Sequence, residues 1–211
     1  MIRQNIYKFD YFKTYYFEGA EFVGKYQMPQ LHGTQSIPQN IVSFAERNSV
    51  RQPEQHWIDH FIDDYRFGSV YPRLLSYLPM YSRFQGIIGT DYSMLPELPM
   101  AENIWNCARN RIIDYCLEST GNDVIPAVGW MDEDSFEWCF DGLPERSSLA
   151  ISTNGCKNEP LSRHIFFRGI EELFRRLNPT HLIICGKALD ELPASDKVLY
   201  YPPHGLYAEV K

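Results

Sequence analysis

Aspartates that follow apolar runs are the residues of this sequence best suited to chemistry. Asp64 follows the run at 57–62, Asp91 follows the run at 84–90, and Asp132 comes shortly after the run at 124–130. Carboxylates brought together from adjacent strands can divide into acid and base, or into nucleophile and acid, because like charges push their pKa values apart. They can equally hold Mg²⁺. Both uses are open from the sequence.

Alternating strands and helices must position these aspartates. Apolar runs predict strands and a 3.6-residue apolar period predicts helices. The expected strands cover 57–63, 84–90, 124–130, 148–153, 181–185 and 198–201, and the expected helices cover 69–82, 99–120, 132–141 and 161–177. Such alternation favours an α/β fold with a mainly parallel sheet. Extended segments at 22–28 and 41–44 would raise the strand count to eight. We therefore expect a compact or incomplete (β/α) barrel slightly more than an open three-layer sandwich, although barrels typically need about 250 residues.

In both architectures ligands bind at the carboxyl ends of parallel strands. This rule selects Asp64 and Asp91 as the expected catalytic pair, with Asp91 as nucleophile or base. Trp130 would offer a flat surface for a base or a sugar. Glycines after strands permit close backbone approach to a ligand. The expected substrate-binding residues are Asn106, Arg109, Trp130, Asn154, Gly155 and Gly186.

The helix expected at 99–120 carries an unusual polar stripe. Asn103, Asn106, Asn110 and Asp114 share one side of it, and Arg109 flanks them. A solvated outer face is the simplest interpretation. However, asparagine is a poor helix former, so the stripe needs a reason. Amides that recognise a base edge or a sugar would supply one, and Arg109 would then meet a carboxylate or a phosphate.

Composition sets the limits of function. The 211 residues are 44% hydrophobic with a net charge of −7, which is typical of a globular domain and argues against a basic clamp for long nucleic acid. Aromatic residues gather near the N-terminus, so we expect an aromatic-rich arm at 1–50 packed on a single α/β domain at 51–211. An exposed arm that binds a partner is the alternative.

Several familiar signals are missing from the sequence. There is no secretory signal, no window of about 18 apolar residues and no C-x-x-C pair among the five cysteines, so we expect a cytoplasmic protein with reduced thiols. A dinucleotide fingerprint and a P-loop are also absent. Cys107 and Cys185 are expected to be buried, and the cofactor, any metal and the oligomeric state are open.

Ordered short motifs resemble those of a domain-of-unknown-function family, number 4417 of that series, which occurs in bacteria, archaea and phages. The motifs are those at 60–67, 91–93, 104–111, 124–130, 140–142 and 153–155, within a match from about 55 to 186. The resemblance is compatible with a phage or mobile-element origin, in which case the host cytoplasm is the expected location, and it implies no particular reaction or cofactor. The family typically has Pro-Asp-Phe-Ser where this chain has Thr90-Asp91-Tyr92-Ser93, so the carboxylate is kept in a different local turn.

Three functions are compatible with these features. The first is an enzyme that acts on a nucleoside, nucleotide or nucleic-acid base, of the N-glycosidase or base-exchange type, through the strand-end aspartates. This expectation rests on analogy at the level of the fold. The second is a non-catalytic phage protein that binds or inhibits a host protein through the aromatic arm. The third is a Mg²⁺-dependent nuclease or phosphatase that uses the same carboxylates.

Overall fold

Parallel strands in chain order form the centre of the molecule. The structure is a computed structural model that describes residues 11–154, 160–187, 189, 191 and 195–202. One sheet contains β3 (Ile41–Ser43), β4 (Trp57–Asp59), β5 (Gly86–Ile88) and β6 (Val124–Ile125), and a second contains β7 (Ser148–Ser152), β8 (His181–Cys185) and β9 (Val198–Tyr201). A parallel bridge between Ala127 and Ala150 links the two sheets. The α/β fold expected from the sequence is confirmed.

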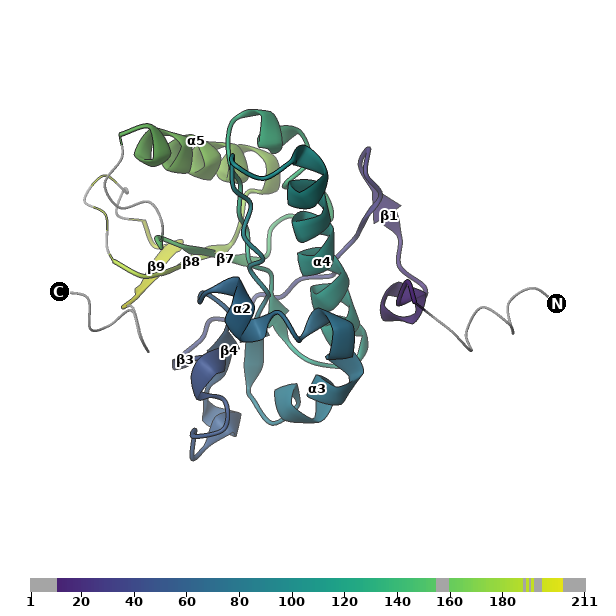
Figure 1. Ribbon diagram of the computed structural model, residues 1–211. Helices are drawn as coiled ribbons and strands as arrows, with labels where there is room; N and C mark the ends of the chain where they lie inside the picture. The colour runs from purple at the N-terminus through teal and green to yellow at the C-terminus, as the bar shows by residue number, and fades with distance from the viewer. Residues whose placement is uncertain (1–10, 155–159, 188, 190, 192–194, 203–211) are drawn as a thin grey trace.

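Helices cover one side of these strands (Figure 1). The α-helices are α2 (Asp64–Phe67), α3 (Leu74–Tyr81), α4 (Met100–Ser119) and α5 (Pro160–Leu177). Short 3₁₀ turns are η2 (Thr14–Phe17), η3 (Phe44–Glu46), η4 (Pro53–Gln55), η5 (Tyr71–Arg73) and η6 (Asp134–Glu137). The expected helices at 99–120 and 161–177 are confirmed as α4 and α5. The helix expected at 132–141 is wrong, because only the single turn η6 forms there.

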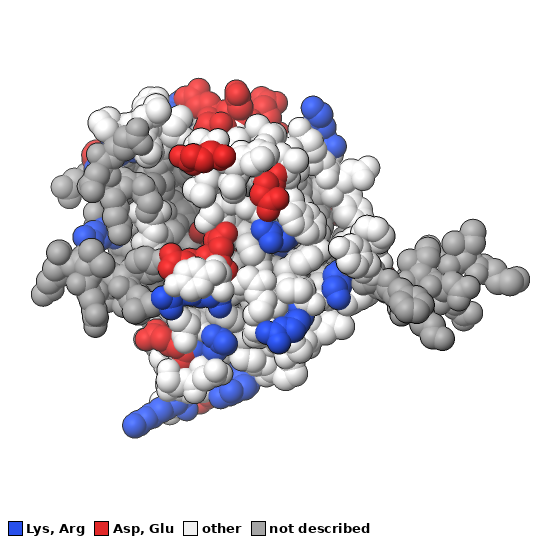
Figure 2. Space-filling model, in the orientation of Figure 1, with Lys and Arg blue, Asp and Glu red and all other residues white. Residues whose placement is uncertain are grey.

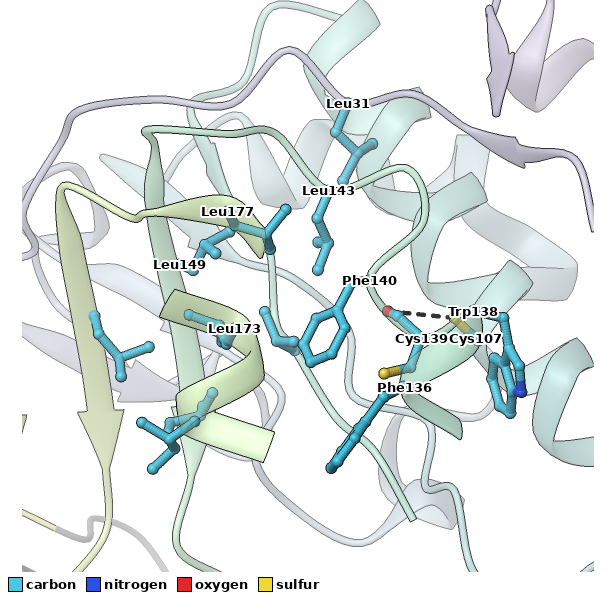
Figure 3. Close-up of a cluster of buried hydrophobic side chains, with 14 of the residues drawn as sticks. Leu31, Cys107, Phe136, Trp138, Cys139, Phe140, Leu143, Leu149, Leu173 and Leu177 are labelled. Carbon is cyan, nitrogen blue, oxygen red and sulfur yellow. Dashed lines mark hydrogen bonds between the residues drawn. The ribbon is translucent and has the colours of Figure 1, made fainter. Parts of the chain in front are cut away.

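Two apolar layers face the helices. Ile58, Ile87 and Val124 pack with side chains of α3 and α4, while Leu149 of β7 packs with Leu173 and other residues of α5. Figure 3 shows the second layer, where Phe140 and the leucines of α5 fill the space beside Leu149. Alternate residues of each strand therefore point toward the helices, as the two-residue period of a strand requires.

A third apolar cluster lies on the opposite face of the strands. It contains Trp57, Ile88, Ile125 and Ile183, and Ile41 of β3 and Tyr201 of β9 both pack against it. Residues of the first strand of one sheet and of the last strand of the other therefore contact the same apolar cluster.

The strands follow one another in chain order within each sheet, and a barrel remains a prediction. The Tyr201 hydroxyl donates a hydrogen bond to the carbonyl of Pro38, just before β3. No strand pairing joins β9 to β3 within the described residues. The extended segment at 41–44 is confirmed as β3. The one at 22–28 is not part of this sheet: β1 (Phe22–Val23) and β2 (Met28–Pro29) form a separate antiparallel hairpin.

The N-terminal segment lies across α4. Tyr16, Met28 and Leu31 are fully buried, and the Tyr16 hydroxyl accepts a hydrogen bond from the Leu74 N–H at 3.1 Å. Glu118 near the end of α4 accepts hydrogen bonds from the backbone of residues 32 and 33. This part of the chain therefore belongs to the core, whereas Tyr11 and Phe12 are 85% and 74% exposed.

Candidate functional site at the carboxyl ends of β5 to β7

A cavity of about 270 Å³ lies where the sequence places a ligand site, beside the carboxyl ends of β5, β6 and β7. Its wall is formed by the loop after β5, the segment after β6, the end of β7 and the first half of α5. Polar and aromatic side chains lining it include Asp91, Ser93, Trp130, Ser152, Asn154 and Phe166. Three sequence-predicted site residues, Asp91, Trp130 and Asn154, therefore meet at one cavity.

Among the described residues that line this cavity, Asp91 is the carboxylic acid. It is partly buried, and a methyl group placed on Gly129 would lie 3.4 Å from its Oδ1 atom, so the absence of a side chain at 129 leaves room beside the carboxyl group. Burial, together with the negative charges of Asp64 and Asp59, raises the pKa of Asp91 to about 7, although the Arg111 guanidinium acts in the opposite direction. Asp91 is therefore populated in both protonation states near neutral pH.

Asp64 reaches the cavity through Ser93. Asp64 begins α2, and its carboxylate accepts hydrogen bonds from the Ser93 hydroxyl at 2.9 Å and from the Ser93 N–H at 3.1 Å. Ser93 lines the cavity, whereas Asp64 does not. The sequence analysis missed Ser93 as a site residue. The available signal was its position two residues after Asp91, which places both side chains on the same side of an extended chain.

The polar stripe of α4 binds the loop that carries Asp91. The Asn110 Oδ1 atom accepts a hydrogen bond from the Tyr92 N–H at 2.9 Å, and the Asn106 side-chain amide donates one to the Ser93 carbonyl at 2.6 Å. Asn103 pairs with both the N–H and the carbonyl of Leu95, at 2.9 Å each. The loop has left the sheet and has no strand partner, so these side chains satisfy its backbone.

This arrangement corrects the interpretation of the stripe as a solvated outer face. Asn103, Asn106, Asn110 and Asp114 are all buried, with at most 3% of their surface exposed. From the sequence, recognition of a base edge or a sugar would explain the asparagines. Their partners in the structure are instead main-chain groups of the loop, which have the same donor and acceptor chemistry as a base edge.

Asn106 and Arg109 do not line the cavity. The Arg109 guanidinium lies over the Tyr92 ring, 4.0 Å from its centroid, and donates a hydrogen bond to the side-chain Oδ1 atom of Asn106. Glu102 approaches it at 4.0 Å. Both side chains therefore support the loop from the side of α4.

Trp130 lines the cavity but is itself firmly held. Its Nε1 atom donates a hydrogen bond to the Ile165 carbonyl at 3.2 Å, and its ring packs at 5.9 Å from the ring of Phe166. Gly169 of α5 makes room for the indole, since a methyl group there would lie 2.0 Å from it.

Asn154, the third predicted residue at the cavity, is held in a similar way. The amide of Asn154 donates a hydrogen bond to the Phe61 carbonyl at 3.2 Å.

Of the two glycines of the sequence prediction, only Gly186 lies in the described part of the chain, and it does not line the cavity. Gly186 has φ of +130° and approaches Thr153, where a methyl group would lie 2.2 Å from the threonine hydroxyl oxygen. Its close contact is thus with the protein's own side chain. Gly155 lies outside the described residues.

Arg111 is a buried cation behind the cavity that the sequence analysis did not select. Only 2% of its surface is exposed, and its guanidinium donates hydrogen bonds to the carbonyls of Ala127, Cys139 and Asp141. These three acceptors are neutral, so the positive charge still acts on the carboxyl groups around it. That charge lowers the pKa of Asp91 and so partly offsets the effect of burial.

Within the described residues, no three His, Cys, Asp or Glu side chains are grouped in a way that would hold a metal ion. None of the described helices has the length and apolar character needed to cross a membrane. Cys107 and Cys185 are buried free thiols, as expected.

Two phage proteins are similar in sequence to this chain. It is 30% identical over 167 residues to the Gene 1 protein of Mycobacterium phage D29, a match that covers 77% of this chain and 61% of the D29 protein. It is 28% identical over 164 residues to the Gene 1 protein of Mycobacterium phage L5, covering 77% of this chain and 72% of the L5 protein. The chain thus spans less than two thirds of the length of the D29 relative.

No solved structure matches the chain. The family model described as "Domain of unknown function (DUF4417)" matches residues 20–202, a longer span than the motifs at 55–186 indicate. The matched span contains all of the described cavity residues. The chain therefore belongs to the DUF4417 family.

Proposed function

We propose that this protein is an enzyme that cleaves or exchanges the base of a nucleoside or nucleotide, with Asp91 as the group that transfers protons. The observation that carries the proposal is the position of Asp91 in the cavity together with its pKa, which burial raises to about 7. A general acid or base is most effective when its pKa lies near the working pH.

The reaction needs one proton to be given and one to be taken. The bond between the sugar carbon and the base nitrogen breaks, and the base leaves with the electron pair and accepts a proton. Water or an incoming base then attacks the sugar carbon and loses a proton. A carboxyl group that is half protonated at neutral pH can give the first proton and receive the second.

The lining of the cavity supports a ligand of this class. Trp130 and Phe166 provide aromatic surface, and Ser93, Ser152 and Asn154 provide hydroxyl and amide groups. The volume of about 270 Å³ is near the lower end of the range for ligand pockets, which suits one small molecule. Figure 2 shows acidic side chains mainly in the upper part of this face and basic side chains mainly in its lower part, where uncharged surface separates them from one another.

The direct test compares the release of free base by the wild type with that by Asp91→Asn. Purified protein is incubated with nucleosides, nucleotides and a single-stranded oligonucleotide, and the released base is measured by chromatography. We expect Asp91→Asn to lower kcat about 10²–10⁴-fold while the fold is retained. Asp63→Asn is the matched control, because Asp63 pairs with Arg66 at the surface and does not line the cavity. Full turnover by Asp91→Asn, or no release by wild type from any substrate, would contradict the proposal.

A second candidate, a partner-binding phage protein, is favoured by one observation. Tyr11 and Phe12 are exposed and pack edge to face at 5.5 Å. Exposed aromatic residues are common anchors of interfaces. Deletion of the whole arm would remove buried Tyr16 and Met28, so the double substitution Tyr11→Ser, Phe12→Ser is the proper test. Loss of a host protein from pull-downs without a change in melting temperature would favour this function, and unchanged capture would oppose it.

A further inference from the structure

The Ser93 hydroxyl donates its hydrogen bond to Asp64. A carboxylate offers only acceptors, and a backbone N–H is only a donor. Asp64 uses one oxygen for the Ser93 N–H, at 3.1 Å, and the other for the Ser93 hydroxyl, at 2.9 Å. A hydroxyl has one proton, so Ser93 has only the lone pairs of its oxygen left for any other partner.

We propose that Ser93 binds the ligand of the Asp91 site as a hydrogen-bond acceptor, and that Asp64 is a positioning residue that fixes this polarity. Ser93 and Asp91 line the same cavity. The ligand must then present a donor, an amino or imino N–H or a sugar hydroxyl, next to the group that exchanges a proton with Asp91. The inference rests on the proposed function and names the hydrogen-bonding class of its substrate.

One substitution should change the Ser93 hydroxyl from an acceptor to a donor toward the cavity, because the Ser93 N–H fixes how the side chain at position 64 is oriented. In Asp64→Asn, the side-chain oxygen must still face the Ser93 N–H, because that N–H cannot become an acceptor. The new NH₂ group therefore faces the Ser93 oxygen and donates to it. The serine proton then has to turn toward the cavity, and Ser93 becomes a donor. The two side chains have nearly the same shape, so the site is otherwise preserved.

Neutron diffraction of deuterium-exchanged crystals tests the proton position without any ligand. We expect the deuterium of the Ser93 hydroxyl to lie between Ser93 and Asp64 in the wild type, and to point into the cavity in Asp64→Asn. A wild-type deuterium that points into the cavity overturns the inference.

Matched nucleosides test the contact with the ligand. The probes are adenosine with inosine, cytidine with uridine, and uridine with 2′-fluoro-2′-deoxyuridine. The first two pairs exchange an exocyclic amino donor for a carbonyl acceptor while the adjacent ring nitrogen changes from acceptor to donor, and the third pair replaces a hydroxyl donor by fluorine. Calorimetry measures their affinities. In at least one pair we expect the wild type to prefer, about 10-fold, the member whose donor faces Ser93, because the other member places an acceptor there. The responsive pair shows whether the base or the sugar faces Ser93.

Variants separate the two residues. Asp64→Asn should reverse the preference, Ser93→Ala should bring it to about unity, and the double variant should behave like Ser93→Ala, because Asp64 acts only through Ser93. Asp63→Asn, the neighbouring control, should leave the preference unchanged. An unreversed preference in Asp64→Asn, or additive effects in the double variant, overturns the inference. If no probe binds the wild type, the proposed nucleoside function fails, and the neutron map alone decides the polarity of Ser93.

Discussion

Asn110 of α4 accepts a hydrogen bond from the N–H of Tyr92 at 2.9 Å, directly after Asp91 in the chain. One turn further along the helix, Asp114 accepts a hydrogen bond from the N–H of Thr90 at 3.3 Å, directly before Asp91. The main chain on both sides of Asp91 is therefore fixed by side chains of one helix. This relationship gives the candidate site a rigid support on a secondary-structure element.

Removal of the Asn110 amide should destabilise the protein. In Asn110→Ala the buried Tyr92 N–H loses its partner, which costs about 1–3 kcal/mol of unfolding free energy. Urea denaturation measures this loss. Asn48→Ala, at an exposed position, is the control and should change stability by less than about 0.5 kcal/mol. Equal stability of the two variants would show that the loop does not depend on α4.

Neutralisation of Asp91 should stabilise the protein more at high pH than at low pH. Burial raises the pKa of Asp91 to about 7 from the ordinary value of 3.8, so its contribution to stability is present below pH 3.8 and is lost as the pH rises through 7. The advantage of Asp91→Asn over wild type should grow by about 2–3 kcal/mol between pH 4.5 and 8. Urea denaturation at both pH values measures it, and a constant difference would argue against the raised pKa.

His60 should give the opposite pH dependence. It is fully buried, with Nδ1 2.9 Å from the Ile88 carbonyl and Nε2 2.8 Å from the Tyr81 hydroxyl, and burial lowers its pKa to about 4 from 6.5. Its contribution to stability is therefore present above pH 6.5 and is lost as the pH falls through 4, by about 3 kcal/mol. His60→Asn should be less stable at pH 7 but should lack this loss. A variant with the same pH slope as wild type would refute the assignment.

Two glycine substitutions separate the cavity from its supporting wall. A methyl group on Gly129 lies 3.2 Å from the end of the flexible Met94 side chain and 3.4 Å from Asp91, so Gly129→Ala should fold normally and weaken ligand binding at least 10-fold. A methyl group on Gly169 lies 2.0 Å from the Trp130 indole. Gly169→Ala should therefore lower stability by about 2 kcal/mol. Thermal melting and nucleoside binding of both variants check this contrast. Normal nucleoside binding by Gly129→Ala would contradict it.

The sequence by itself determined most of the regular elements and the edge at which the site lies. The apolar run before Asp91 and the helical period of 161–177 depend only on neighbours in the chain, so they predict β5 and α5 directly. The rule that ligands bind at the carboxyl ends of parallel strands then selected Asp91, Trp130 and Asn154, which share the cavity. It could not show how far each side chain reaches.

Only the tertiary structure decided what the polar residues do. A stripe of asparagines looks the same whether water, a ligand or a distant loop faces it, and here the loop at 90–98 does. Asp64 and Ser93 are 29 residues apart, and Arg111 meets three carbonyls from other segments. Hydrogen-bond partners of this kind come from anywhere in the chain, and periodicity carries no information about them. Apolar burial is non-directional and can be predicted from local patterns, whereas the role of a buried polar group depends on which partner the fold brings to it.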